Sequence, residues 1–282
     1  MNDHSDILIE LALAEDIGEG DVTSHYFIPK ERRASAFVAV RKDGVVSGVE
    51  LAARVFSTVD RELAVEILIA DGSRVSSGAL LIRVEGSARS ILTAERTALN
   101  FLQHLSGVAT LTAQYVEQIK GTGAQVLDTR KTTPGYRMLE KQAVVHGGGG
   151  NHRLGLYDRA MVKDNHLIAE GGTAAIQAAI HKLKSEQPDV EVELEADSLE
   201  QLRSFLTLEG VDYILLDNMT LEQLHEAVVL RGELGRPLLE ASGGITLETL
   251  RDIAMTEVDF ISVGALTHSA PALDIGLDFE TL

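Results

Sequence analysis

Strand-like runs alternate with amphipathic helical stretches through the second half of the chain, from about residue 124 to residue 265. The six apolar runs are AQVLDT, RAMVKDN, VEVELEA, YILLDN, LLEASGG and DFISVGA, and helical patterns separate most of them. Two strands joined through a helix lie parallel in one sheet. This repetition predicts a parallel sheet flanked by helices, either open or closed into a barrel.

Polar residues at the carboxyl end of every run distinguish these two arrangements. In a barrel all carboxyl ends open onto one mouth, whereas an open sheet collects side chains only at a switch point. No G-x-G-x-x-G follows the first run, which also disfavours a dinucleotide-binding sheet. We therefore predict an α/β barrel. The polar sets, in strand order, are Asp128, Arg130 and Lys131; Lys163, Asp164, Asn165 and His166; Glu195 and Asp197; Asp217 and Asn218; Ser242, Gly243 and Gly244; and Gly264.

The first part of the chain has a different pattern. A helix is expected over Ser5 to Glu15, followed by three strand-rich segments separated by glycine turns: ASAFVAVRKDGVVSGV, AVEILIADGSRV and ALLIRVEG. An apolar stripe at helical spacing then predicts a long helix from Ala88 to Lys120. These features indicate a separate N-terminal domain in which antiparallel strands pack with helices.

Composition excludes several classes of protein. The net charge of −18 and the aromatic content of 4% argue against binding to nucleic acid or to an anionic membrane. The absence of cysteine excludes disulfides, thiolate catalysis and cysteine-bound metals. The acidic N-terminus does not resemble a signal peptide, and no apolar run is long enough to cross a bilayer. We expect a cytoplasmic protein.

A basic segment interrupts this acidic chain between residues 128 and 166. A four-glycine run, Gly147 to Gly150, leads into Asn151, His152 and Arg153. Arginine binds carboxylate or phosphate through two parallel hydrogen bonds, and glycine lets a ligand approach the backbone. The segment predicts a pocket for a small acid with more than one negative group, with Lys163 as an anion clamp. Its cations are Arg130, Lys131, Arg137, Lys141, His152, Arg153 and Lys163.

Two further elements complete a candidate active site. The segments SGGI (242–245) and SVGAL (262–266) predict a phosphate cradle near the last two strands. Glu195 and Asp217 follow neighbouring strands and are candidate Mg²⁺ ligands. The alternative for these carboxylates is a salt bridge to Lys131 or Lys163. Glu191, deeper on the same strand face, has pairing with an inward lysine as its alternative role.

Nine segments spread along the chain are characteristic of one protein family. They are EDIGEGDVTS (15–24), ERTALNFLQHLSGVAT (95–110), DTRKTTPGYRMLEKQAV (128–144), GGGNHRLGLYD (148–158), VKDNH (162–166), EVELEADSLEQL (191–202), ILLDN (214–218), EASGGI (240–245) and ISVGALTHSAPALDIGLDF (261–279). Through these segments the chain resembles the quinolinate phosphoribosyltransferase family, nearly end to end. Departures are Gln142, where an aromatic residue is expected, and His146, where the family often has cysteine.

The resemblance implies a reaction and a fold. Quinolinate and phosphoribosyl pyrophosphate would give nicotinate mononucleotide, pyrophosphate and CO₂, a step of de novo NAD synthesis that uses Mg²⁺. The fold would be an incomplete α/β barrel of the type II phosphoribosyltransferase kind, spanning residues 113–267. A sheet-and-helix domain would occupy residues 1–112, and the tail, 268–282, would pack on that domain.

Individual roles also follow from the resemblance. Arg130, His152 and Arg153 would hold the two quinolinate carboxylates, with Lys163 near both substrates. Lys131 would contact the phosphoribosyl group or the diphosphate, and Glu195 and Asp217 would hold Mg²⁺ and the ribose or diphosphate. Arg96 would reach into the active site of a neighbouring subunit in a homodimer, or in a hexamer. The 5′-phosphate would lie on Ser242, Gly243, Gly244 and Gly264.

Three other interpretations are less consistent with the sequence. A molybdenum-transport-associated relative shares the barrel and acts on another acceptor, but it usually lacks the full NHRxGLYD and VKDNH pattern present here. A lipoyl or biotinyl carrier would share the DGxxVxxGxxL turns, yet Lys42, the nearby candidate for modification, precedes its glycines awkwardly. A ligand-sensing barrel without catalysis does not account for the complete set of carboxylates and cations.

Overall fold

A computed structural model describes residues 2–163, 172–232 and 235–280, which pack into two compact units. The first comprises Met1–Ala113, Thr133–Gly148 and Ser269–Leu282, and the second comprises Gln114–Thr132 and Gly149–His268. The division into domains at residues 112 and 267 stays a prediction. Residues 133–148, which that division assigned to the barrel, pack with the first unit.

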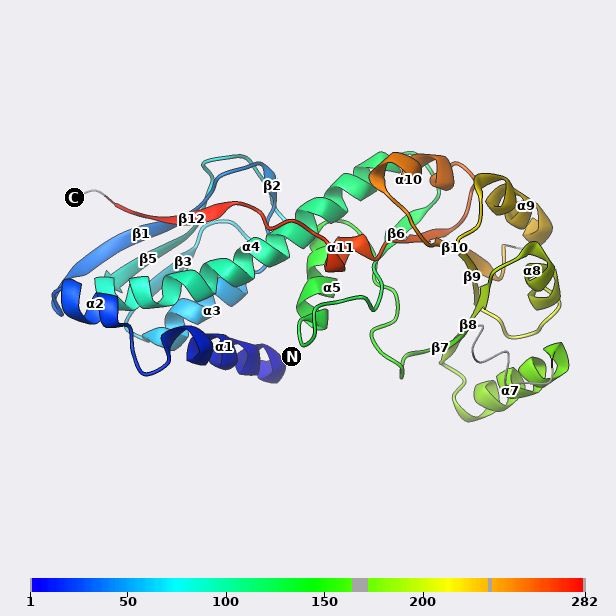
Figure 1. The fold of residues 1–282 in the computed structure, drawn as a ribbon, viewed down its shortest axis with the longest axis horizontal. Helices are drawn as coiled ribbons and strands as arrows, with labels where there is room; N and C mark the ends of the chain where they lie inside the picture. The colour runs from blue at the N-terminus through cyan, green and yellow to red at the C-terminus, as the bar shows by residue number, and fades with distance from the viewer. Residues whose placement is uncertain (1, 164–171, 233–234, 281–282) are drawn as a thin grey trace. The chain divides into compact units, whose positions relative to one another are not determined.

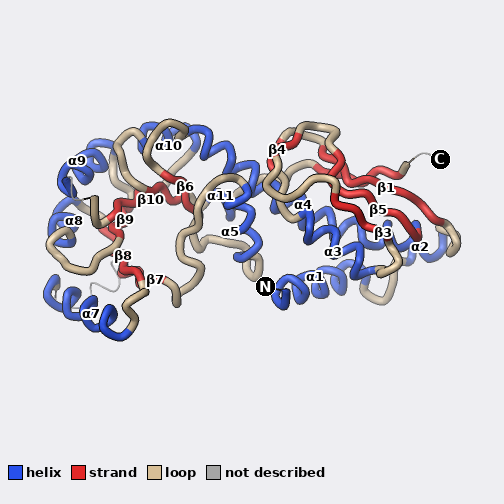
Figure 2. Tube along the Cα trace, turned by 180° about the vertical axis from the view of Figure 1, so that it is seen from behind, coloured by secondary structure: helices blue, strands red, loops and turns tan. Residues whose placement is uncertain are grey.

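The first unit is built around a four-stranded antiparallel sheet (Figures 1 and 2). Its order is β12-β1-β5-β3, so the strand from the end of the chain pairs with the first strand, with Val38 opposite Leu277. A short ribbon joins β2 to β4. The strands are β1 (Arg33–Val40), β2 (Gly44–Val45), β3 (Ala64–Ile67), β4 (Arg74–Val75), β5 (Leu80–Ser87) and β12 (Ile275–Phe279).

Helices bury the apolar side of this unit. The predicted long helix is present as α4, and its Phe101, Leu102 and Leu105 are at most 2% exposed. The amphipathic helix α3 packs against β3 and β5 and buries Val55 and Phe56. The helices that lie wholly or largely in this unit are α1 (Asn2–Ile17), α2 (Val22–Phe27), α3 (Val49–Val59), α4 (Ala88–Gln118) and α5 (Arg137–His146).

The second unit contains the predicted parallel sheet. Its order is β6-β11-β10-β9-β8-β7, and among the described residues no ladder joins β7 back to β6, so the barrel is incomplete. The strands are β6 (Gln125–Leu127), β7 (Arg159–Val162), β8 (Glu191–Ala196), β9 (Tyr213–Asp217), β10 (Leu238–Ser242) and β11 (Phe260–Ser262). The helices are α7 (Thr173–Glu186), α8 (Leu199–Phe205), α9 (Leu221–Arg231), α10 (Leu247–Ala254) and α11 (Ala265–His268).

Local sequence explains where several of these helices begin. The Ser198 hydroxyl accepts a hydrogen bond from the Gln201 amide, and Thr220 forms a capping box with Gln223. Such caps satisfy amide groups that the first turn of a helix leaves without partners. The predicted cap at Thr246 is present as well, because its amide donates to the Thr249 hydroxyl at 3.1 Å.

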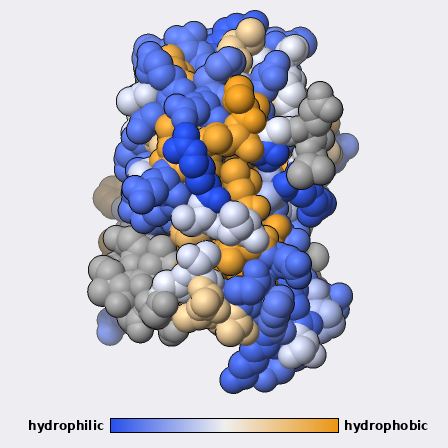
Figure 3. All heavy atoms as spheres, turned by 90° about the vertical axis from the view of Figure 1, so that its right-hand side faces the viewer, coloured by the Kyte–Doolittle hydropathy of each residue, from blue (hydrophilic) through white to orange (hydrophobic). Residues whose placement is uncertain are grey.

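On the side of the molecule where α7, α8 and α9 lie, hydrophilic surface flanks a band of hydrophobic side chains (Figure 3).

Alternation along the strands separates an apolar face from a charged one. In β8, Val192, Leu194 and Ala196 are at most 1% exposed, whereas the intervening positions are Glu193 and Glu195. Successive side chains of a strand point to opposite faces, so the glutamates share the face opposite the aliphatic residues. The sheet therefore packs through one face and carries chemistry on the other.

Within the described residues, no helix is both long enough and apolar enough to cross a membrane.

We expect Leu216→Ala to lower the free energy of unfolding by about 3 kcal/mol, because it removes a fully buried side chain from β9 and leaves a cavity. Val229→Ala on α9 is the control, since Val229 is 70% exposed and its truncation should change stability by about 0.5 kcal/mol or less. Urea denaturation followed by circular dichroism measures both. Equal stability of the two variants would contradict this account of the core.

Candidate active site

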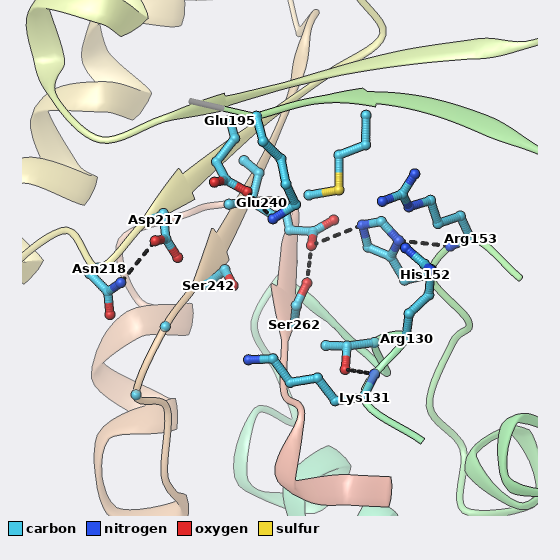
Figure 4. Close-up of a pocket in the computed structure, with 16 residues that line it drawn as sticks. Arg130, Lys131, His152, Arg153, Glu195, Asp217, Asn218, Glu240, Ser242 and Ser262 are labelled. Carbon is cyan, nitrogen blue, oxygen red and sulfur yellow. Dashed lines mark hydrogen bonds and ion pairs between the residues drawn. The ribbon is translucent and has the colours of Figure 1, made fainter. Parts of the chain in front are cut away.

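The second unit contains a cavity of about 550 Å³ at the carboxyl ends of its strands (Figure 4). Most of the residues proposed from sequence line it: Arg130, Lys131, His152, Arg153, Lys163, Glu195, Asp217, Ser242, Gly243 and Gly244. Gly264 is not in the lining, but a Cβ there would lie 3.1 Å from Cδ of Lys131. Arg96 is an exposed residue of α4 in the first unit. Asp164, Asn165 and His166 fall outside the described residues.

The cavity also has lining residues that the sequence analysis did not single out as site residues. Strand alternation provided a signal for Glu240, because it lies two positions before Ser242 and so shares its face. Ser262 begins the SVGAL segment that was predicted to form part of a phosphate cradle, but its side chain was given no role of its own. The additional lining residues are Thr129, Met161, Leu215, Asn218, Glu240 and Ser262.

The basic side of the cavity is formed by two arginines. Arg153 is 9% exposed, and its Nη1 donates to the carbonyl of Arg159 at 3.4 Å. Burial, followed by repulsion from Arg130, lowers the pKa of Arg153 below its ordinary value. A buried guanidinium group with a second, partly exposed one nearby is stabilised when an anion binds between or beside them. This side of the cavity therefore suits a small carboxylic acid.

His152 is held from both ring nitrogens. Nδ1 accepts a hydrogen bond from the Arg153 amide at 2.7 Å, which assigns the proton of a neutral ring to Nε2. Nε2 lies 3.1 Å from Oε2 of Glu193 and 3.4 Å from Oε1 of Glu240. Both nitrogens thus face protein groups here, and contact between His152 and a bound carboxylate stays a prediction.

The glycine run before His152 is fixed to the end of β6. Asp128 accepts the His152 amide at 2.8 Å, and its own amide donates to the Gly150 carbonyl at 3.1 Å. A Cβ on Gly150 would lie 2.8 Å from Cδ2 of Leu127 and 2.9 Å from Nε2 of Gln125, so a side chain there would force these two side chains to move. This close approach explains why glycine precedes the Asn151-His152-Arg153 segment and how the imidazole is brought to the cavity wall.

The acidic side of the cavity faces this basic side. Carboxylate oxygens of Glu195, Asp197 and Asp217 lie within 4.8 Å of one another. Lys163 Nζ is 2.6 Å from Oε2 of Glu195, so the salt bridge that was the alternative for this carboxylate is formed. Asn218 donates to Asp217 at 2.9 Å. Hard oxygen ligands from two strand ends, with Asp217 and Glu195 both lining the cavity, fit a Mg²⁺ ion that shares its coordination with a substrate.

A layer of ionic and aromatic groups lies beneath the cavity. Arg159 pairs with Glu191 at 2.9 Å and stacks over Tyr213, with Cζ 4.0 Å from the ring centroid. The Tyr213 hydroxyl donates to Glu191 at 3.0 Å. The alternative in which Glu191 pairs with an inward lysine is therefore wrong. The cation that faces Glu191 is an arginine on the neighbouring strand β7.

The predicted phosphate loop has backbone geometry that only glycine adopts readily. Gly243 and Gly244 have φ values of +98° and +60°. A Cβ on Gly243 would lie 2.2 Å from Oδ1 of Asn218. Both glycines line the cavity directly before α10, whose N-terminal amides add positive potential.

Together, the fold and cavity define an incomplete α/β barrel with an acid-binding side, a carboxylate cluster and a glycine loop at one mouth. The family model described as "Quinolinate phosphoribosyl transferase, C-terminal domain" matches residues 108–278, and the model for the corresponding N-terminal domain matches residues 21–106. The chain therefore belongs to the quinolinate phosphoribosyltransferase family.

Similar proteins agree with this membership. A nicotinate-nucleotide pyrophosphorylase [carboxylating] of Mycobacterium leprae is 44% identical over 275 residues, covering 96% of this chain and 95% of the relative. Its chloroplastic counterpart from Arabidopsis thaliana is 42% identical, covering 97% and 82%. The solved structure of the nicotinate-nucleotide pyrophosphorylase from Francisella tularensis superposes with a TM-score of 0.92 at 38% identity, covering 99% of this chain and 97% of that one.

We expect Gly243→Ala to weaken binding of a phosphate monoester, ribose 5-phosphate, by about tenfold, because the new methyl group would push Asn218 or the loop out of place. Gly232→Ala is the matched control: its φ is +69°, yet nothing lies within 4 Å of its added Cβ, and it is absent from the cavity lining. Isothermal titration calorimetry measures the affinity. Equal losses in both variants would show that backbone strain, rather than the contact with Asn218, is responsible.

Proposed function

We propose that this chain transfers the phosphoribosyl group of phosphoribosyl pyrophosphate to quinolinate. The products are nicotinate mononucleotide, pyrophosphate and CO₂, as in de novo NAD synthesis. Family membership and the names of the relatives support this reaction. The observation that carries it is one cavity in which a buried arginine faces a carboxylate cluster and a glycine loop. No specific observation favours the molybdenum-transport-associated alternative.

The acid is bound by the basic side of the cavity. Arg130 and Arg153 hold the two carboxylates of quinolinate, and His152 borders the same side. Arginine forks suit this task because each can make two parallel hydrogen bonds to one carboxylate. Such binding fixes the ring and aims its nitrogen at the sugar carbon, which lowers the entropic part of the barrier.

The donor is bound by the other side. Ser242, Gly243, Gly244 and the nearby Gly264 receive the 5′-phosphate, and Lys131 contacts the phosphoribosyl or diphosphate group. Lys163, which pairs with Glu195, lies between the two ligands. Glu195 and Asp217 would hold Mg²⁺, which when bound offsets the negative charge that gathers on the departing pyrophosphate.

The two chemical steps follow from this arrangement. As the bond from C1 of the ribose to pyrophosphate breaks, positive charge develops on C1, and the nearby carboxylates of Glu195 and Asp217 stabilise it. The quinolinate nitrogen then forms the new bond to C1. The resulting pyridinium accepts the electron pair released when the 2-carboxylate leaves as CO₂, and C2 takes up a proton. No protein-bound organic cofactor is needed.

Arg96 connects the proposed reaction with the assembly of the protein. Arg96 is exposed on α4, where it is available to another chain. We infer that the protein is a homodimer, or a hexamer built from dimers, in which Arg96 completes the acid pocket of its neighbour. We also propose that the protein acts in the cytoplasm, in keeping with its cysteine-free composition.

Incubation with quinolinate, phosphoribosyl pyrophosphate and Mg²⁺ should yield nicotinate mononucleotide and CO₂ in equal amounts. The reason is that each transfer to quinolinate forms one nucleotide and releases its 2-carboxylate as one CO₂. Chromatography of the nucleotide, together with release of labelled CO₂ from the 2-carboxylate, measures both products.

Nicotinate in place of quinolinate is the control, because it has one carboxylate and should give little product. Chelation of Mg²⁺ should abolish turnover of quinolinate, and renewed addition of Mg²⁺ should restore it. A folded protein that binds the donor yet leaves quinolinate unchanged would overturn the proposed function and direct attention to another acceptor.

Mixing Arg96→Ala with Glu195→Gln tests the contribution of the neighbouring chain. Each variant alone should be nearly inactive. A mixed dimer has one site that lacks both groups and one intact site, so it should recover about half of the activity of the unaltered dimer. Doubly tagged mixed dimers isolate the species to be assayed.

Lys163→Ala mixed with Glu195→Gln provides the matched control. Both of these residues belong to the second unit and line one cavity, so every site in the mixed dimer retains a defect. Recovery in the control as well, or in neither mixture, would refute a role for Arg96 in the partner's site.

A further inference from the structure

Two fully buried carboxyl groups converge on one imidazole nitrogen at the wall of the cavity. The side chains of Glu193 and Glu240 are both 0% exposed, and that of His152 is 6% exposed. Nε2 of His152 lies 3.1 Å from Glu193 Oε2. It also lies 3.4 Å from Glu240 Oε1 (Figure 4). The single proton assigned to Nε2 cannot compensate two buried negative charges.

The two carboxyl groups have unequal partners. Arg159 Nη1 lies 3.6 Å from Glu193 Oε2, so Glu193 has a guanidinium group beside it. Glu240 instead accepts a hydrogen bond from the neutral hydroxyl of Ser262 on Oε1. The buried Oε2 of each glutamate has no hydrogen-bond partner in the described part of the chain, but that of Glu193 has the Arg159 guanidinium near it. A buried carboxyl group that lacks an adjacent cation is far more stable with its proton than without it.

The electrostatic surroundings point the same way. Burial, and next the charge of Glu193, raise the pKa of Glu240 well above its ordinary value, while Arg159 opposes the shift and Asp128 adds to it. Glu240 is not one of the proposed Mg²⁺ ligands, Glu195 and Asp217. It belongs instead to a second, fully buried group with His152 and Glu193, whose nitrogen and carboxylate oxygens lie within 4.8 Å of one another.

We propose that Glu240 is a positioning residue that works as a neutral carboxylic acid. In that form it lies against His152 while leaving Glu193 as the one negative charge at Nε2, and it keeps a second negative charge away from the wall beside Arg153. Loss of its proton would repel a dianionic acid and disturb His152. The kinetic test of this role rests on the proposed function. If Glu240 acts as a neutral acid, quinolinate should bind more weakly at alkaline pH.

Charged and polar side chains on the elements around Glu240 affect whether it keeps its proton. A variant that tests Glu240 must therefore leave these side chains in place. The wall contributes Arg159 from β7, Glu193 from β8, Asp128 from the end of β6, His152 from the glycine loop and Ser262 from β11. The cavity side contributes Arg130, Lys131, Arg153, Lys163, Glu195 and Asp217. Glu240→Gln keeps all of these and the shape of the side chain, but it removes the titrating proton.

The kinetic experiment measures KM for quinolinate and kcat against pH at saturating donor. For the unaltered enzyme, KM should rise by up to about tenfold per pH unit once Glu240 loses its proton, with a smaller change in kcat. In Glu240→Gln this rise should disappear. Glu200→Gln, an exposed position on α8, should retain it. The same alkaline rise in Glu240→Gln, or a KM raised at every pH in that variant, would overturn the proposal.

A substrate-free experiment separates this proposal from the reaction itself. The infrared difference between the unaltered protein and Glu240→Gln in D₂O should contain the band of a protonated carboxyl group at neutral pH. Because the folded protein then binds a proton that the unfolded chain has released, the free energy of unfolding should fall as pH rises from the ordinary pKa of glutamate towards the raised pKa of Glu240. Glu240→Gln should lack this slope. Absence of both signals would overturn the role of Glu240 even if quinolinate is turned over.

Discussion

Charge on the inward face of the parallel sheet is the constraint on which the rest of this structure depends. Barrel interiors are usually filled with branched aliphatic side chains. Here Glu193, Glu240 and Arg159 occupy that space, and the first two are fully buried. Charges removed from water must be paired, hydrogen-bonded or neutralised by a proton. The layer beneath the cavity meets this requirement through the Arg159 ion pairs, the Tyr213 stack and a neutral Glu240.

This buried layer has consequences for the cavity above it. It fixes His152, whose backbone amide is held by Asp128 and whose ring is held at both nitrogens. A fixed wall holds Arg153 on one side of the cavity, which has a volume of about 550 Å³, and Asp217 and Glu195 on the other, where Glu195 pairs with Lys163. The proposed substrates carry negative groups for one side and developing positive charge for the other, so an arrangement that is costly without ligand is suited to the reaction.

Glycine has a separate structural role at two points of the mouth. Gly150 lies against Leu127 and allows the loop to approach β6, and Gly243 adopts a positive φ against Asn218. In both places a methyl group would meet atoms closer than 3 Å. At Gly243, which lines the cavity, backbone rather than a side chain therefore faces the space for a ligand, which suits a phosphate group.

Much of the fold and site could be predicted because it depends on local pattern. The period of two in β8, the capping residues at Ser198 and Thr220, and the polar strand ends are properties of a few adjacent residues. The order of strands, which brings Asp217 beside Ser242, followed from the rule that βα units make parallel sheets with their carboxyl ends together.

What the sequence by itself determined was therefore which residues face inward and at which end of the sheet they lie. Only the tertiary structure decided which charged side chains pair with one another and which segments pack together. It gave Glu191 an arginine in place of a lysine, placed residues 133–148 with the first unit, and brought Glu240 to the same imidazole as Glu193. Such pairings join residues that lie far apart in the chain, and their energies depend on burial and on distances between side chains, which no local pattern encodes.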